Sequence, residues 1–254
     1  MAVMASMPGA AKSLAKPSDQ AQPESKQKMS LNALRFPAKS VPATAAVIFL
    51  HGLGDSGAGW SFLAEEAART KLFEHVNFVF PNAPTKPVTL NMGMPMPSWY
   101  DIYSLDKLGQ VDEKGILESA RVVEQFIKEQ TDQGISPDRI VVGGFSQGGA
   151  VTLSTSMITK IKLAGFVALS GYLPLKDKFA AESNNTNKET PYFMGHGTDD
   201  QVVRFQYGET SSKALQEEFG RQVEFHSYPG MPHSACPEEL AHLFKFLGNT
   251  IPKQ

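Results

Sequence analysis

Apolar residues along this chain follow two alternating patterns. Short continuous apolar runs bounded by turn residues predict strands buried on both faces, at residues 47–50, 76–80, 139–143, 164–169 and 192–194. Residues 223–228 alternate apolar and polar positions, which predicts a strand with one wetter face. Apolar spacings of three and four predict intervening helices, at residues 116–127, 203–219 and 237–247. Strands that alternate with helices indicate an α/β fold with a mostly parallel central sheet and helices on both faces.

The stretch 81–101 fits neither pattern. It combines repeated prolines with leucine, methionine and aromatic side chains, so it cannot form a regular helix. A long apolar loop in a compact domain is more often functional than idle. We therefore expect this segment to serve the site.

Residues 1–30 differ from the rest of the chain. They are rich in Ala, Ser, Lys, Gln and Pro and contain no aromatic residue or isoleucine. Such a segment buries too little apolar surface to offset the entropy of ordering, so we predict a disordered tail before a domain at 31–254. The alternative is an organellar targeting sequence, because lysines and serines lie among alanines, but the absence of arginine and the presence of Asp19 and Glu24 argue against it.

Composition narrows the functional classes. The 254 residues carry 24 basic and 26 acidic side chains without a basic stripe, so we expect no nucleic-acid partner. The longest apolar run, at 45–50, is far shorter than the roughly 20 residues of a membrane-spanning helix, and we find no secretory signal. The single cysteine, Cys236, cannot form an internal disulfide, which suits a reducing compartment. We expect a soluble protein of the cytoplasm, with the nucleus as a second location.

The clearest chemical motif is the sequence GFSQGG at residues 144–149. It follows an apolar run and precedes a helix-compatible segment at 150–160, as the Gly-x-Ser-x-Gly nucleophile elbow requires. Ser146 would lie on a strained turn, where larger side chains at Gly144 and Gly148 would collide with the adjoining strand and helix. The alternative, a glycine-rich turn with an incidental serine, does not explain this context.

A serine hydroxyl needs a base to remove its proton, and in this architecture the base follows the acid in the chain. His233 lies between the last predicted strand and the last predicted helix, where that base is presented. The other histidines after Ser146 have simpler assignments. His196 follows a buried strand and would shape the acid loop, His226 takes a polar strand position, and His242 lies within the last helix.

Two adjacent aspartates compete for the role of the acid. Asp199 and Asp200 both follow the strand at 192–194. One would hold the imidazole tautomer, and the other would serve as a turn or N-cap residue. Residue types and spacing alone do not separate them.

The oxyanion donors are expected to be backbone amides. The glycine-rich loop at 51–57 directly follows the strand at 47–50, and Gln147 follows the nucleophile. These positions make the N–H groups of Leu53 and Gln147 the candidates, each worth roughly 3 kcal/mol of transition-state stabilisation. His51 and Asp55 are expected to brace the loop.

Several motifs together resemble one known family. They lie in order at residues 45–57, 87–92, 96–102, 143–149 and 231–234. From about Leu31 to the C-terminus, the chain resembles the acyl-protein thioesterases of the phospholipase/carboxylesterase family, which have the α/β-hydrolase fold and are also called lysophospholipases.

The resemblance implies a complete set of site residues. The family pattern His-Gly-x-x-Asp-x-x-Val matches residues 196–203 and selects Asp200 as the acid beside Ser146 and His233. It supports the assigned oxyanion donors and implies no metal or cofactor. It also implies that the loop at 87–99 flanks an acyl channel, for which the candidate residues are Leu90, Met92, Met96 and Trp99.

The resemblance further implies hydrolysis of palmitoyl thioesters on protein cysteines. The partners would be S-acylated proteins and, as a second class, lysophospholipids, with at most transient contact to a membrane surface. Activity on small carboxylic esters or lysophospholipids is the alternative, and a non-catalytic ligand receptor on the same fold is a third hypothesis. The tail is longer than the family leads us to expect and lacks an N-terminal cysteine for lipidation, so stable anchoring by that route is not supported.

Overall fold

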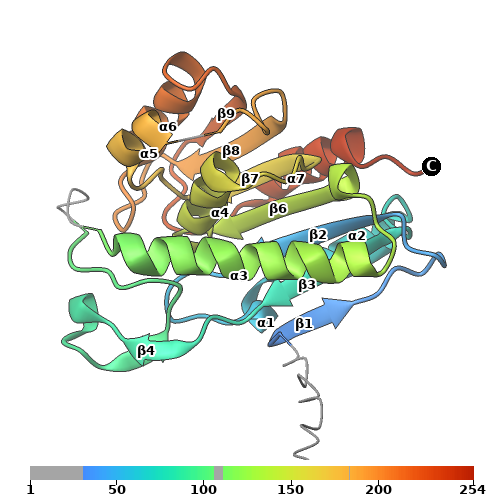
Figure 1. Cartoon of the computed structure of the whole chain (residues 1–254), viewed down its shortest axis with the longest axis horizontal. Helices are drawn as coiled ribbons and strands as arrows, with labels where there is room; N and C mark the ends of the chain where they lie inside the picture. The colour runs from blue at the N-terminus through green and yellow to red at the C-terminus, as the bar shows by residue number, and fades with distance from the viewer. Residues whose placement is uncertain (1–30, 106–110, 183) are drawn as a thin grey trace, which may run out of the picture. The chain divides into compact units, whose positions relative to one another are not determined.

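The computed structural model describes residues 31–105, 111–182 and 184–254 (Figure 1). The predicted tail at 1–30 lies outside this part of the chain. In the described residues a central sheet of seven strands has the order β1-β3-β2-β6-β7-β8-β9. Neighbouring strands from β3 to β9 are parallel, and β1 pairs antiparallel with β3. The strands are β1 (Ala33–Phe36), β2 (Ala45–Leu50), β3 (Val76–Pro81), β6 (Ile140–Phe145), β7 (Gly165–Leu169), β8 (Pro191–Gly197) and β9 (Gln222–Tyr228).

Helices cover both faces of this sheet, as Figure 1 shows. On β2, Ile48 and Leu50 point into one apolar cluster with residues of α3 and α4, whereas Val47 and Phe49 point into another with residues of α2 and α7. The helices are α1 (Gly57–Trp60), α2 (Phe62–Thr70), α3 (Glu113–Asp132), α4 (Gln147–Ile158), α5 (Lys176–Glu182), α6 (Phe205–Glu217) and α7 (Pro237–Thr250), with a short 3₁₀ turn η2 (Pro137–Arg139). The predicted mostly parallel sheet with helices on both faces is confirmed.

The structure adds elements that the apolar pattern did not indicate. The edge strand β1 has only four residues and is partly exposed, so it lacks a continuous buried run. Helices α2 and α5 are short, which leaves few turns over which a periodicity could be recognised.

The proline-rich stretch after β3 contains a small antiparallel pair, β4 (Thr85–Pro87) and β5 (Pro95–Pro97), joined through the 3₁₀ turn η1 (Thr89–Asn91). Proline can occupy such a two-stranded ribbon because its missing N–H is tolerated at a strand edge. The segment returns to the core at Trp99 and Tyr100, which are each 1% exposed.

The carboxyl ends of the parallel strands meet at one edge of the sheet, where ligands bind in open α/β folds. The segments that follow β2, β6, β8 and β9 therefore converge there, and they carry the residues that the sequence singled out. Across residues 31–105, 111–182 and 184–254, no helix combines the length and the apolar character needed to span a bilayer.

Candidate active site

Ser146 lies at the sharp turn between β6 and α4. Its φ of 54° and ψ of −116° are unusual for a residue with a side chain, and such strain typically costs about 1–3 kcal/mol. A Cβ at Gly144 would lie closer than 3.0 Å to the backbone of Gly148, and one at Gly148 would lie equally close to the carbonyl oxygen of Leu50. The two glycines thus let strand, turn and helix approach one another closely, and the turn places Ser146 at the carboxyl end of β6.

The structure brings three predicted side chains into one hydrogen-bonded row. His233 Nε2 lies 2.9 Å from Ser146 Oγ, and His233 Nδ1 lies 2.7 Å from Asp200 Oδ2. In the arrangement that satisfies both bonds, Nδ1–H donates to the carboxylate and Nε2 accepts from the hydroxyl. The ring of Phe145 packs against the imidazole at a centroid distance of 4.7 Å and limits its rotation.

Asp200 is held as a charged group in a buried setting. Its Oδ1 accepts the backbone N–H groups of Val202 at 2.9 Å and Val203 at 2.8 Å, and its side chain is 0% exposed. Burial by itself favours the neutral acid, but hydrogen bonds from His196, His233 and the Val203 amide outweigh it and hold the pKa of Asp200 below its usual range. The carboxylate can therefore stabilise a positive charge on the imidazole.

Two neighbours of Asp200 have structural contacts. His196 Nε2 lies 2.7 Å from the carbonyl oxygen of Val203 and 3.4 Å from Asp200 Oδ2, so it shapes the loop that carries Asp200. Asp199 is exposed and accepts a hydrogen bond from the Thr198 hydroxyl at 3.1 Å. The structure thus turns Asp200, and not Asp199, toward His233.

The two candidate oxyanion amides flank Ser146. Gln147 is the first residue of α4, where backbone N–H groups have no partner within the helix. A Cβ at Gly52 would lie 3.4 Å from the Ser146 Cβ, which puts the loop carrying Leu53 directly beside Ser146. His51 braces this loop, since its Nδ1 lies 2.6 Å from the Gly52 carbonyl oxygen and its Nε2 accepts the backbone N–H of Ala83 at 3.1 Å.

The side chain of Gln147 also contributes to the site, through hydrogen bonds that the sequence did not reveal. It is 2% exposed, and its Oε1 accepts the Trp99 backbone N–H at 2.9 Å. Its Nε2 donates to the Tyr100 carbonyl oxygen at 2.7 Å and to Ser98 Oγ at 3.0 Å. Gln147 thus joins the turn at Ser146 to the end of the proline-rich segment, and no local pattern signals such a long-range bond.

The four substrate-loop candidates occupy different environments. Leu90 lines a pocket beside Ser146, whereas Met92 is 86% exposed and Met96 is partly buried on β5. Trp99 is buried, and its indole N–H donates to the His51 carbonyl oxygen at 2.9 Å. Leu90 is therefore the candidate that lies at the pocket wall, and Trp99 packs beneath the loop.

The pocket beside Ser146 has a volume of about 80 Å³ and is mostly apolar. Sequence reasoning had not singled out several of its walls, which come from segments far apart in the chain: Tyr100, Ile102, Leu105, Tyr172, Val202, Val203 and Tyr207. The hydroxyls of Tyr100 and Tyr172 lie 3.0 Å apart, and burial raises the pKa of each, so both phenols stay neutral.

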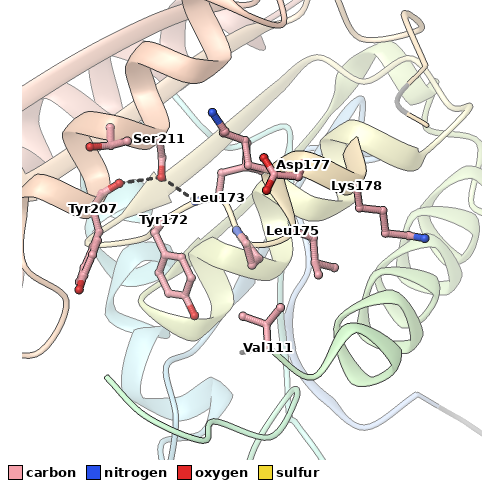
Figure 2. Close-up of a pocket in the computed structure, with 11 residues that line it drawn as sticks. Val111, Tyr172, Leu173, Leu175, Asp177, Lys178, Tyr207 and Ser211 are labelled. Atoms are coloured by element: carbon pink, nitrogen blue, oxygen red, sulfur yellow. Dashed lines mark hydrogen bonds between the residues drawn. The ribbon is translucent and has the colours of Figure 1, made fainter. Parts of the chain in front are cut away.

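A larger groove of about 400 Å³ adjoins this pocket through Tyr172 and Tyr207, which line both (Figure 2). Leu173 and Leu175 form part of its wall. Ser211 fixes this wall, because its Oγ accepts the Leu173 backbone N–H at 2.8 Å and donates to the Tyr207 carbonyl oxygen at 2.6 Å.

The mostly parallel sheet, the serine turn after β6 and the order Ser146, Asp200, His233 along the chain define an α/β-hydrolase. The profile of the phospholipase/carboxylesterase family matches residues 32–251, and the chain belongs to that family. The resemblance indicated by the sequence motifs is thereby confirmed.

Individual relatives extend this comparison. The chain is 52% identical to acyl-protein thioesterase 1 of Yarrowia lipolytica over 221 residues, covering 86% of this chain and 97% of that protein. It is 48% identical to acyl-protein thioesterase 1 of Mycosarcoma maydis over 230 residues, covering 86% and 96%.

Solved structures agree in fold. Arabidopsis thaliana SOBER1 superposes with a TM-score of 0.75 at 33% identity, covering 82% of this chain and 99% of that chain. Zea mays acyl-protein thioesterase 2 gives a TM-score of 0.75 at 28% identity, covering 87% and 99%.

Proposed function

We propose that this protein is an acyl-protein thioesterase that removes fatty acyl groups, palmitoyl above all, from S-acylated protein cysteines. The observation that carries the proposal is the row of Ser146, His233 and Asp200 beside an apolar pocket. The acyl-protein thioesterase names of relatives at 52% and 48% identity support the substrate class.

In the proposed reaction, His233 Nε2 takes the proton from Ser146 Oγ while this oxygen attacks the thioester carbonyl carbon. Asp200 stabilises the resulting imidazolium, and the N–H groups of Leu53 and Gln147 hold the tetrahedral oxyanion. The intermediate collapses with cleavage of the C–S bond, and His233 returns the proton to the leaving cysteine sulfur. Water, deprotonated by His233, then attacks the acyl-serine ester, and His233 returns this proton to Ser146 Oγ as the C–O bond breaks and the fatty acid leaves.

The acyl chain is proposed to enter between Leu90 and Tyr172. Sites for small ligands typically measure about 300–1,000 Å³, so the pocket of about 80 Å³ beside Ser146 holds only the first part of a long chain. We propose that movement of Tyr172 and Tyr207 opens this pocket into the neighbouring groove of about 400 Å³, which takes the remainder.

The proposed partners are S-acylated proteins, met in the cytoplasm or nucleus during transient contact with a membrane surface. Met92 and Met94, which are 86% and 50% exposed, support such contact because apolar side chains at a loop tip can insert shallowly between lipid headgroups. The protein would release from the surface readily, since so small an apolar area gives a weak attachment.

A substrate panel tests the proposal. Hydrolysis is followed for one cysteine-containing peptide carrying a palmitoyl, octanoyl or acetyl thioester, and for palmitoyl lysophosphatidylcholine and p-nitrophenyl acetate. We expect kcat/KM to be greatest for the palmitoyl thioester. Turnover confined to acetyl and simple esters would instead identify a small-ester carboxylesterase, and preference for the lysolipid would identify a lysophospholipase.

A further inference from the structure

A buried carboxyl group lies close to the loop that carries His233. Glu239, in the first turn of α7, is 0% exposed, and neither of its carboxyl oxygens has a hydrogen-bond partner in the described part of the chain. Buried acidic groups are normally paired, so an unpaired one requires an explanation. The proposed reaction does not use this group.

Two glycines of β8 make room for the segments on either side of His233. A Cβ at Gly195 would overlap Oε1 of Glu239, and a Cβ at Gly197 would overlap the backbone of Met231. Met231 precedes His233 by two residues, and Glu239 follows it by six. The segments before and after His233 therefore pack against the same face of β8.

The upstream flank is held by hydrogen bonds. The Thr198 N–H donates to the Tyr228 carbonyl oxygen at 3.0 Å, the Asp199 N–H donates to the Met231 carbonyl oxygen at 3.2 Å, and the Gly230 N–H donates to Thr198 Oγ1 at 2.9 Å. On the downstream flank, the Glu239 carboxyl packs against Gly195 of β8, and farther along α7 the Phe246 ring packs against Phe193 of β8 at a centroid distance of 5.7 Å.

We propose that Glu239 is a positioning residue whose neutral carboxyl, seated against Gly195, fixes the downstream flank of the His233 loop, and whose ionisation releases it. A carboxylate cannot remain in this seat without a partner and would withdraw toward water, so His233 would lose its alignment with Ser146. The inference rests on the proposed role of His233.

The titratable groups around Glu239 come from three elements. On β9, the Tyr228 ring lies against Gly195 beside the Glu239 carboxyl, and Glu224 and His226 lie on the same strand. Cys236 precedes α7, and Glu238 and His242 belong to α7. From β8, His196 projects to the opposite face, toward Gly208 of α6. No lysine or arginine is paired with Glu239 among the described residues. Burial raises the pKa of Glu239 to about 8, so ionisation occurs in a mildly alkaline range.

The test compares Glu239→Gln, which keeps the shape without the ionisation, with Glu238→Gln on the exposed neighbouring position. Hydrolysis of a chromogenic butyryl ester is measured from pH 6.5 to 9.5, with circular dichroism at each pH. For the unmodified protein and Glu238→Gln, we expect kcat at pH 9 to fall about tenfold, as for an active form that loses one proton near pH 8. Glu239→Gln should keep its pH 7 rate within about twofold and show no such decline.

A second variant, Glu239→Leu, supplies the neutral apolar counterpart and should behave like Glu239→Gln. An unchanged alkaline decline in folded Glu239→Gln would overturn the inference. So would failure of both neutral variants to fold at pH 7, because the seat would then require the carboxyl itself. The pH profile on the butyryl ester tests only the alignment of Ser146 and His233, so it does not depend on acyl specificity. Failure of the proposed function would instead appear in the thioester panel.

Discussion

The side chain of Gln147 offers a test of how the turn at Ser146 supports the proline-rich segment at 81–101. Gln147→Ala removes the amide that binds the Trp99 N–H and the Tyr100 carbonyl oxygen but leaves the backbone N–H proposed for the oxyanion. The substitution therefore separates the structural contribution of the side chain from the chemical contribution of the backbone.

The magnitude follows from the partners left behind. The Tyr100 carbonyl oxygen still accepts the Ser98 hydroxyl at 2.6 Å, so the Trp99 N–H is the group that loses its partner. A buried unsatisfied donor costs about 1–3 kcal/mol. The empty volume left by a side chain that is 2% exposed adds to this, so we expect a total loss of about 2–4 kcal/mol. The loop keeps its other anchors, including the Ser119 hydroxyl bound to the Trp99 carbonyl oxygen at 2.5 Å, and the variant should fold.

Urea unfolding measures the effect, with Gln216→Ala as the matched control. Gln216 is exposed and donates a single hydrogen bond to the Val223 carbonyl oxygen at 2.9 Å, so its removal should change stability by less than about 0.5 kcal/mol. For Gln147→Ala we expect urea unfolding to show the loss of about 2–4 kcal/mol, and thermal unfolding to show a Tm lower by roughly 4–16 °C. Activity should fall more on long acyl chains than on short ones. A loss of stability no greater than that of the control would refute the reasoning.

Three further outcomes follow from the site. Gly148→Ala should lower the free energy of unfolding by about 1–3 kcal/mol or more, because the added Cβ would collide with the Leu50 carbonyl oxygen. Gly248→Ala should be neutral or slightly stabilising, because the space around Gly248 is open. Thermal unfolding of the two variants measures the difference. Asp200→Asn should lower kcat about 10⁴-fold and Asp199→Asn by less than about threefold, and similar losses in both would contradict the assignment of the acid. Because the folded-state pKa of Asp200 lies below its unfolded value near 3.9, the carboxylate stabilises the fold above that pH, and this contribution is lost as the pH falls. Urea unfolding at decreasing pH below about 4 should therefore show a steeper loss of stability for the unmodified protein than for Asp200→Asn.

Local chemistry explains why much of the fold and the sharp turn at Ser146 could be predicted. The continuous apolar run of β2 is readable because both of its faces are buried, and the turn at Ser146 is readable because Gly144 and Gly148 must lack side chains. The edge strand β1 escaped prediction because half-exposed residues leave no distinctive pattern.

Features that depend on distant contacts could not be predicted in the same way. Asp199 and Asp200 differ in the direction of their side chains, which backbone bonds at Val202 and Val203 determine. Trp99 has a large apolar side chain of the kind that can line an acyl site, yet the hydrogen bond from its indole N–H to the His51 carbonyl oxygen holds it beneath the loop. The walls at Tyr172 and Tyr207 and the carboxyl seat of Glu239 likewise exist only once separate strands and helices have packed.

Release of fatty acid from a palmitoylated cysteine peptide by the unmodified protein and by Ser146→Ala is the most direct measurement. The unmodified protein should cleave the thioester, and the variant, with unchanged circular dichroism, should lose activity about 10⁴-fold or more. A folded Ser146→Ala variant that retains most of the thioester hydrolysis would contradict the assignment of Ser146 as the nucleophile.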